Sequence, residues 1–165
     1  MSSNEITIDT NVFEHLFNPQ NNEDDHIDAL LRSLIERRVA LCIDRSGRIF
    51  GEYGHQLNPF FKKNDQAQRV IWLRYFLVLA ERKEVVVNGG DSLMVSIRGQ
   101  IPFAEASDQI FVYVAIFSDC ILISNDHGHI TNHRNDLRRS ARKHGSKTTD
   151  FIDSKNAYSS MVSAS

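Results

Sequence analysis

The sequence has few cysteines and no long apolar run, so an ordinary hydrophobic core is expected to stabilise the fold. Its 165 residues include two cysteines, Cys42 and Cys120, and each lies in an apolar run. Cysteines in such runs are usually buried free thiols, so neither a disulfide framework nor a cysteine-rich metal site is expected. No apolar run approaches the roughly 20 residues of a membrane span, and the first residues show no signal-peptide pattern. We therefore expect a cytoplasmic protein without a membrane partner.

An excess of charge of either sign is also missing. The formal net charge is −2, with 41% hydrophobic and 24% charged residues. This composition is typical of a globular protein, and a chain of this length should bury roughly 70% of its unfolded surface in one core. A nearly neutral chain has no general basic coat for nucleic acid, so any such binding must come from a local patch.

Short apolar segments alternate with helical patterns along the chain. The strand candidates are residues 6–9, 39–43, 85–87 and 120–124. The helix candidates are residues 12–17, 27–38, 48–57, 65–79, 103–117 and 135–143. All-apolar strands separated by helices indicate a parallel sheet with both faces covered. The predicted fold is therefore α/β, a three-layer α/β/α sandwich around a central parallel sheet.

Several finer features follow from the same patterns. The helix over 65–79 is apolar nearly all round, which predicts burial on every side. Asn58-Pro59 is expected to end the helix before it, and residues 93–97 fit either a strand or a helical turn. Residues 1–150 should form one domain. Residues 151–165 should be a polar, partly disordered tail, with room for a short edge strand at 151–152.

Four acidic residues occupy positions that can meet in such a fold. Asp9 and Asp126 each follow an apolar strand, and the carboxyl ends of parallel strands can lie side by side. Glu52 follows the second strand, and Asp108 lies in the helix before the last strand of 120–124. Clustered carboxylates repel one another unless a cation neutralises them. Oxygen ligands select Mg²⁺ or Mn²⁺, ions that bind a phosphodiester and activate a water.

Each of the four carboxylates could, on its own, cap a turn or a helix or remain solvated. Their joint order is what carries the prediction. Glu105 and Asp44 are rival members of the cluster. Glu105 lies three positions before Asp108, so one helix face could present both, and we favour Asp108.

The strand endings Asp-Thr-Asn at 9–11 and Ser-Asn-Asp at 124–126 resemble those of PIN-domain nucleases. Many members of that family are VapC-type ribonuclease toxins of toxin–antitoxin pairs. The resemblance covers about residues 6–126. It implies a compact α/β/α sandwich and Mg²⁺- or Mn²⁺-dependent cleavage of RNA. A toxin would also imply an antitoxin partner that occludes the site, and a homodimer.

The resemblance also implies roles for individual residues. The family's acidic residues would be matched by Asp9, Glu52, Asp108 and Asp126. Asn11 would match the small polar residue that orients Asp9, with Thr10 and Asn125 supporting the site.

A basic helix after Asp126 supplies candidate nucleic-acid contacts. Basic side chains recur there at four-residue spacing, which places them on one helix face. Together with one arginine near Glu52, the candidates are Arg134, Arg138, Arg139, Arg142, Lys143 and Arg48. A solvated charged face is the ordinary alternative. Because the helix follows Asp126 closely, it should lie beside the acidic residues, and this placement makes phosphate binding as well supported as a solvated face. Phe60-Phe61-Lys62-Lys63 is a second mixture of aromatic and basic residues that could hold RNA.

Three histidines, His127, His129 and His133, follow Asp126. Without partner cysteines they do not predict a zinc site, and we expect a polar loop with one histidine near the substrate. The sequence thus predicts a metal-dependent endoribonuclease. The alternatives are a non-catalytic binding module on the same fold and a nuclease that cuts DNA.

Overall fold

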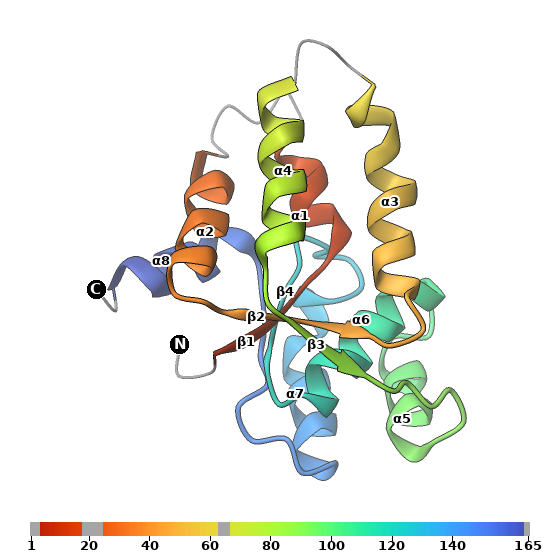
Figure 1. The fold of residues 1–165 in the computed structure, drawn as a ribbon. Helices are drawn as coiled ribbons and strands as arrows, with labels where there is room; N and C mark the ends of the chain where they lie inside the picture. Colours follow the sequence, from red (N-terminus) through yellow and green to blue (C-terminus); the bar gives the residue numbers. More distant parts are fainter. Residues whose placement is uncertain (1–3, 18–24, 63–66, 164–165) are drawn as a thin grey trace.

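Five short parallel strands form the centre of the computed structural model, which describes residues 4–17, 25–62 and 67–163 (Figure 1). The strands are β1 Glu5–Ile8, β2 Ala40–Asp44, β3 Arg82–Val85, β4 Ile121–Ile123 and β5 Phe151–Ile152. Their order in the sheet is β3-β2-β1-β4-β5. The predicted α/β class and the parallel sheet are confirmed.

The middle strand β1 is apolar because both of its faces are covered. Ile6 and Ile8 are buried, and they pair in register with Leu41 of β2 and Ile123 of β4. From β1 the chain moves outward to β2 and β3, then crosses back to β4 on the other side. The strand order therefore reverses between β1 and β4. Ligands of open α/β sheets bind at the carboxyl ends of the strands at such a reversal.

Helices cover both faces of the sheet. They are α1 Thr10–His15, α2 Asp25–Glu36, α3 Arg48–Phe61, α4 Ala67–Leu79, α5 Ser92–Gln100, α6 Ala106–Phe117, α7 Arg134–Lys143 and α8 Ser154–Ser163. Figure 1 shows α1 to α4 on one face and α5 to α7 on the other. The three-layer arrangement follows from this placement. None of the helices in the described ranges has the length and hydrophobicity that a membrane span requires.

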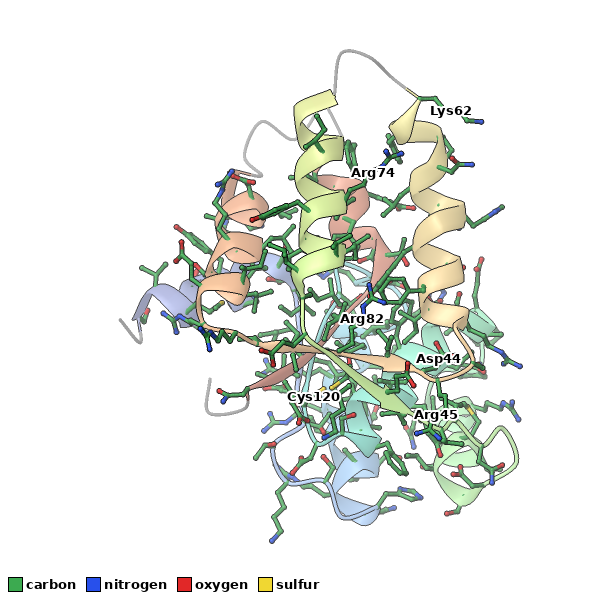
Figure 2. The ribbon with its side chains drawn as sticks, viewed as in Figure 1. Asp44, Arg45, Lys62, Arg74, Arg82 and Cys120 are labelled. Atoms are coloured by element: carbon green, nitrogen blue, oxygen red, sulfur yellow. The ribbon has the colours of Figure 1, made fainter. Side chains whose placement is uncertain are left out.

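Helix α6 is the central element of its layer. It lies against β1, β2 and β4, and its residues from Ile110 to Ile116 are all buried. The two cysteines are buried free thiols, as the sequence predicts; Cys120 lies just before β4 (Figure 2).

Helix α3 does not end at Asn58-Pro59 but continues through Pro59 to Phe61. The expectation of a stop was wrong, because side-chain packing holds the last turn. Leu57 is buried, and the ring of Phe60 stacks on Phe17 at a centroid distance of 5.1 Å.

Helix α4 is buried on one side only, which corrects the expectation of burial all round. Leu73 and Phe76 face the core, whereas Ile71, Tyr75 and Val78 are 67%, 52% and 74% exposed. The helix packs against α2 and α3 in the outer layer. Apolar residues on every face therefore leave an exposed apolar surface on this helix.

The third strand and the segment after it differ in detail from the sequence pattern. β3 spans Arg82–Val85 rather than residues 85–87, and its first three residues are charged and exposed. Charged side chains suit a strand at the edge of a sheet because they discourage pairing with another chain. The undecided segment 93–97 lies in α5, whose first turn is capped by Asp91 through a hydrogen bond from Met94 N of 2.9 Å.

The expected tail is an integral part of the fold, so the domain does not end at residue 150. The short edge strand at 151–152 is confirmed as β5, and α8 packs against α2. Phe151, Ala157 and Met161 are buried. A polar, serine-rich helix can pack in this way because a few apolar residues on one face are enough to bury it.

Candidate active site

Asp9 follows β1 directly and lies at the reversal of strand order. Its backbone N–H donates to Ile123 O at 2.9 Å, which continues the pairing of β1 with β4. Its Oδ2 accepts hydrogen bonds from Ser124 Oγ at 2.6 Å and from Asn11 Nδ2 at 2.9 Å. The side chain also caps α1. Asp9 is thus held rigidly, and only 3% of it is exposed.

The environment of Asp9 disfavours its charged form. Burial raises the pKa of Asp9, and the charges of Asp108 and Asp126 raise it further; hydrogen bonds from Ser124 and Asn11 act in the opposite direction. The result is a pKa of about 7 instead of 3.8. A buried carboxylate with two acidic neighbours is a place where a cation would be strongly stabilising.

Asp108, Asp126 and His129 form a compact group beside Asp9. Each offers a ligand atom, and these atoms lie within 4.8 Å of one another. Asp126 is fixed by His129, whose backbone N–H donates to Oδ1 at 3.0 Å and whose Nδ1 lies 3.0 Å from Oδ2. Burial, together with the charge of Asp126, raises the pKa of Asp108. Carboxylates from α6 and from the end of β4 therefore converge, as the sequence predicts.

The candidate supporting residues have different roles in the structure. Asn11 bridges the two strands, because its Oδ1 accepts from Asn125 N at 2.9 Å while its amide donates to Asp9. The side chain of Asn125 points to another part of the fold, where its Oδ1 accepts from Ser154 N. Thr10 is buried, and its hydroxyl has no hydrogen-bond partner among the described residues.

Glu52 is not part of the group formed by Asp108, Asp126 and His129. It is half-buried on α3 and accepts a hydrogen bond of 3.2 Å from Gln56 Nε2. Its charge contributes, after burial, to the raised pKa of Glu14. Of the four expected carboxylates, Asp108 and Asp126 share one group of potential ligands, and Asp9 is linked to both through their charges. Glu52 has neither relationship.

Neither rival acidic residue belongs to that group. Asp44 is buried at the end of β2 (Figure 2) and accepts from the Ser46 hydroxyl, from Arg48 N at 2.9 Å and from Ile49 N at 2.7 Å. Burial raises its pKa, but these hydrogen bonds outweigh burial and leave the pKa below the usual value. Asp44 is thus a helix cap. Glu105 is exposed and directly precedes α6; its backbone N–H donates to Asp108 Oδ2 at 3.0 Å.

Three of the basic residues of α7 form ion pairs with aspartates. Arg134 makes two hydrogen bonds of 2.6 Å to Asp150, and Arg138 Nε lies 3.8 Å from the same carboxylate. Asp150 directly precedes β5, at the edge where the strands begin. Arg139 pairs with Asp136 within α7. Three of the candidate nucleic-acid contacts are therefore engaged in ion pairs within the protein.

The other basic candidates are more widely separated. Arg142 and Lys143 are exposed in the last turn of α7, about 12 to 14 Å along the helix from its start. Arg48 is exposed at the start of α3, on the edge of the sheet where the strands end. Lys62 lies at the opposite end of α3, far from the sheet (Figure 2). Lys63 lies outside the described residues.

The sequence did not predict that Ser124 and Tyr53 lie at the candidate site, and it did not distinguish His129 from the two neighbouring histidines. Ser124 follows β4 at the position opposite Asp9, but only the strand register reveals that contact. The hydroxyl of Tyr53 donates to Ile8 O, and burial raises the pKa of Tyr53 well above its usual value, with the charge of Asp9 adding to the effect. Of the three histidines, His129 is the one whose ring contacts the Asp126 carboxylate, and this contact is visible only in the structure.

Comparisons of the chain with protein-family models, with curated proteins and with solved structures find no match. The functional argument therefore depends on the residues themselves and on their arrangement at the ends of β1 and β4.

Proposed function

We propose that this protein is a metal-dependent nuclease that hydrolyses phosphodiester bonds of RNA. The observation that carries the proposal is the convergence of Asp108, Asp126 and His129 beside the buried carboxylate of Asp9. These groups lie where the strand order of a parallel sheet reverses, which is the usual position of ligands in this class of fold.

The donor set fits a divalent cation. Carboxylate oxygens suit Mg²⁺ and Mn²⁺, and an imidazole nitrogen makes Mn²⁺ the better match of the two. A cation bound there would polarise the phosphodiester and lower the pKa of a water molecule. His129 also orients Asp126 through the contact at Nδ1, so it has a role as a positioning residue even where it is not a ligand.

In such a site, some residues would supply the carboxylates and others would orient them. Ser124 and Asn11 hold Asp9 in one orientation. Asp108 comes from the first turn of α6, and Asp126 comes from the loop after β4, so the two approach from different elements. Rigid placement of this kind is what positions a water and a phosphate for in-line attack. The expected products carry a 5′-phosphate and a 3′-hydroxyl.

RNA as the substrate, an antitoxin partner and a homodimer are further parts of the proposal, and they come from the resemblance to PIN-domain toxins. The exposed side chains of Ile71, Tyr75 and Val78 on α4 support a contact between two copies. An antitoxin would act by covering the carboxyl edge of the sheet.

A second candidate function is a non-catalytic binding module on the same fold. The position of Glu52 favours it, because the fourth expected carboxylate lies beside Glu14 and Gln56 and not in the metal-ligating group. A module of this kind would bind nucleic acid or protein without cutting it.

The test is cleavage of an RNA and a single-stranded DNA of equal sequence by purified protein, with Mn²⁺ or with EDTA. The unmutated protein is compared with Asp126→Asn and with Asp28→Asn, a matched control at an exposed aspartate that pairs with Arg32. We expect RNA cleavage with Mn²⁺ only, lost in Asp126→Asn and retained in Asp28→Asn. Cleavage of DNA alone would identify a DNA nuclease. Absence of any cleavage, with no stabilisation by Mn²⁺, would favour the binding module.

A further inference from the structure

Phe103 is an exposed aromatic residue in the loop that leads into α6. It is 88% exposed, more than any other large hydrophobic side chain in the part of the chain that the structure describes. A phenylalanine in water forgoes the stabilisation that burial of its ring would give. Its chain neighbours Pro102, Glu105 and Ala106 are also exposed, so this short segment as a whole faces solvent.

A tight turn presents this ring. Ile101 is buried and anchors the loop, and Ala104 N donates to Ile101 O at 3.2 Å, which closes a four-residue turn. Pro102 occupies the second position of the turn, where its fixed φ angle is favourable. Phe103 therefore lies at the tip of a turn that is restrained by a proline and by a buried anchor.

The same turn is tied to the candidate active site. Glu105 N donates to Asp108 Oδ2 at 3.0 Å, and Gln109 Nε2 donates to Ala104 O at 3.4 Å. Backbone bond lengths place the Cα atom of Phe103 within about 9 Å of the Asp108 carboxylate. A nucleotide held at Asp108 and Asp126 would thus have a neighbour within reach of the ring.

We propose that Phe103 is a specificity-determining residue that stacks on an unpaired base beside the cleavage position, and so selects single-stranded RNA. The inference rests on the proposed nuclease function for the position of the strand. One ring face is enough to stack a base, and any base can stack, whereas bases inside a duplex already stack on each other. A protein interface would need a much larger surface than one side chain.

The experiment measures binding of fluorescently labelled RNA by anisotropy, with the RNA single-stranded or annealed to its complement. It is done with Mn²⁺ in the Asp9→Asn background, which prevents cleavage. Phe103→Ala is compared with Phe103→Trp and with Phe117→Ala, a control at an exposed phenylalanine at the other end of α6. Thermal unfolding of each variant verifies the fold.

We expect Phe103→Ala to weaken binding of single-stranded RNA about 5- to 150-fold, the range for the loss of one base–aromatic stack. Phe103→Trp should retain binding, Phe117→Ala should leave it unchanged, and no variant should change binding of the duplex. Equal single-stranded binding by Phe103→Ala and the parent would overturn the inference. An equal loss for duplex, or a change of oligomeric state in size-exclusion chromatography, would also overturn it. Weakened binding together with no cleavage by unmutated protein would reject the nuclease function alone.

Discussion

The hydroxyl of Ser124 donates a hydrogen bond of 2.6 Å to Asp9 Oδ2, although the two residues are 115 positions apart in the chain. The same Ser124 oxygen accepts from the backbone N–H of Asp126 at 3.1 Å. One small side chain at the end of β4 therefore fixes both the carboxylate that follows β1 and the backbone that carries the second one. This contact joins the two strand ends on which the candidate active site is built.

Replacing Ser124 with alanine should impair the site without unfolding the protein. Ser124→Ala removes a hydrogen bond that lowers the pKa of Asp9, so that pKa should rise further. We expect Mn²⁺ affinity to fall about 10- to 100-fold, as for other residues that orient metal ligands. Calorimetric titration with Mn²⁺ measures this. Ser160→Ala, at an exposed serine of α8, is the control. Equal Mn²⁺ affinity in Ser124→Ala and unmutated protein would contradict the prediction.

The pKa of Asp9 predicts how metal-free stability depends on pH. Because this pKa is raised from 3.8 to about 7 by folding, the native state holds a proton that the unfolded state loses between these values. The free energy of unfolding should therefore fall as pH rises through this window, by at most about 4 kcal/mol for this group. The asparagine of Asp9→Asn does not ionise, so the free energy of unfolding of this variant, relative to that of the unmutated protein, should increase with pH. Urea unfolding in EDTA across the window measures the difference; a constant difference would refute the pKa assignment.

Glu52 and Asp108 should behave differently when neutralised. Asp108→Asn removes a ligand from the metal group, so stabilisation by Mn²⁺ should be largely lost. Glu52→Gln should keep that stabilisation because Glu52 contacts Gln56 and lies near Glu14. Thermal unfolding with and without Mn²⁺ measures both. If Glu52→Gln loses the Mn²⁺ effect as Asp108→Asn does, all four carboxylates act together, as the sequence alone predicts.

The arginines of α7 should separate into a structural and a solvent-exposed class. Arg134 is paired twice with Asp150, and its side chain is partly exposed, so Arg134→Ala should lower the free energy of unfolding by roughly 1 kcal/mol. Arg142→Ala should leave stability unchanged. If the exposed end of α7 contacts RNA, Arg142→Ala should lower the magnitude of the slope of log K against log salt concentration by about one, the value for one lost phosphate contact. An unchanged salt dependence would exclude that role.

Helix α8 should be essential for stability. The side chain of Met161 in α8 is buried, and its backbone oxygen accepts a hydrogen bond of 3.0 Å from Arg37. Met161→Ala should lower the free energy of unfolding by about 2 kcal/mol or more through the loss of buried surface and the cavity left behind. Urea unfolding measures this, with Val162→Ala, at an exposed neighbour, as the control. Equal stability of the two variants would mean that α8 is the dispensable tail suggested by its composition.

The alternation of strands and helices was predictable from local patterns, because a buried parallel strand has to be apolar along its whole length. From this alternation the parallel sheet follows, and with it the meeting of Asp9 and Asp126 at one edge. Asp108 was also predictable, since its helix directly precedes the strand β4. These features depend on local patterns and on the common direction of the strands.

The elements that cover each face of the sheet, and the pairing of the polar groups, could not be predicted from local patterns. The continuation of α3 through Pro59 and the burial of Met161 depend on partners far away in the chain. The same reason explains why Ser124 contacts Asp9 although no role was predicted for it: strand register places the two residues opposite each other. Glu52 was a predicted ligand, but α3 places it near Glu14. Periodicity shows which side of an element is apolar, but the partner of that side is set by the packing of the whole chain.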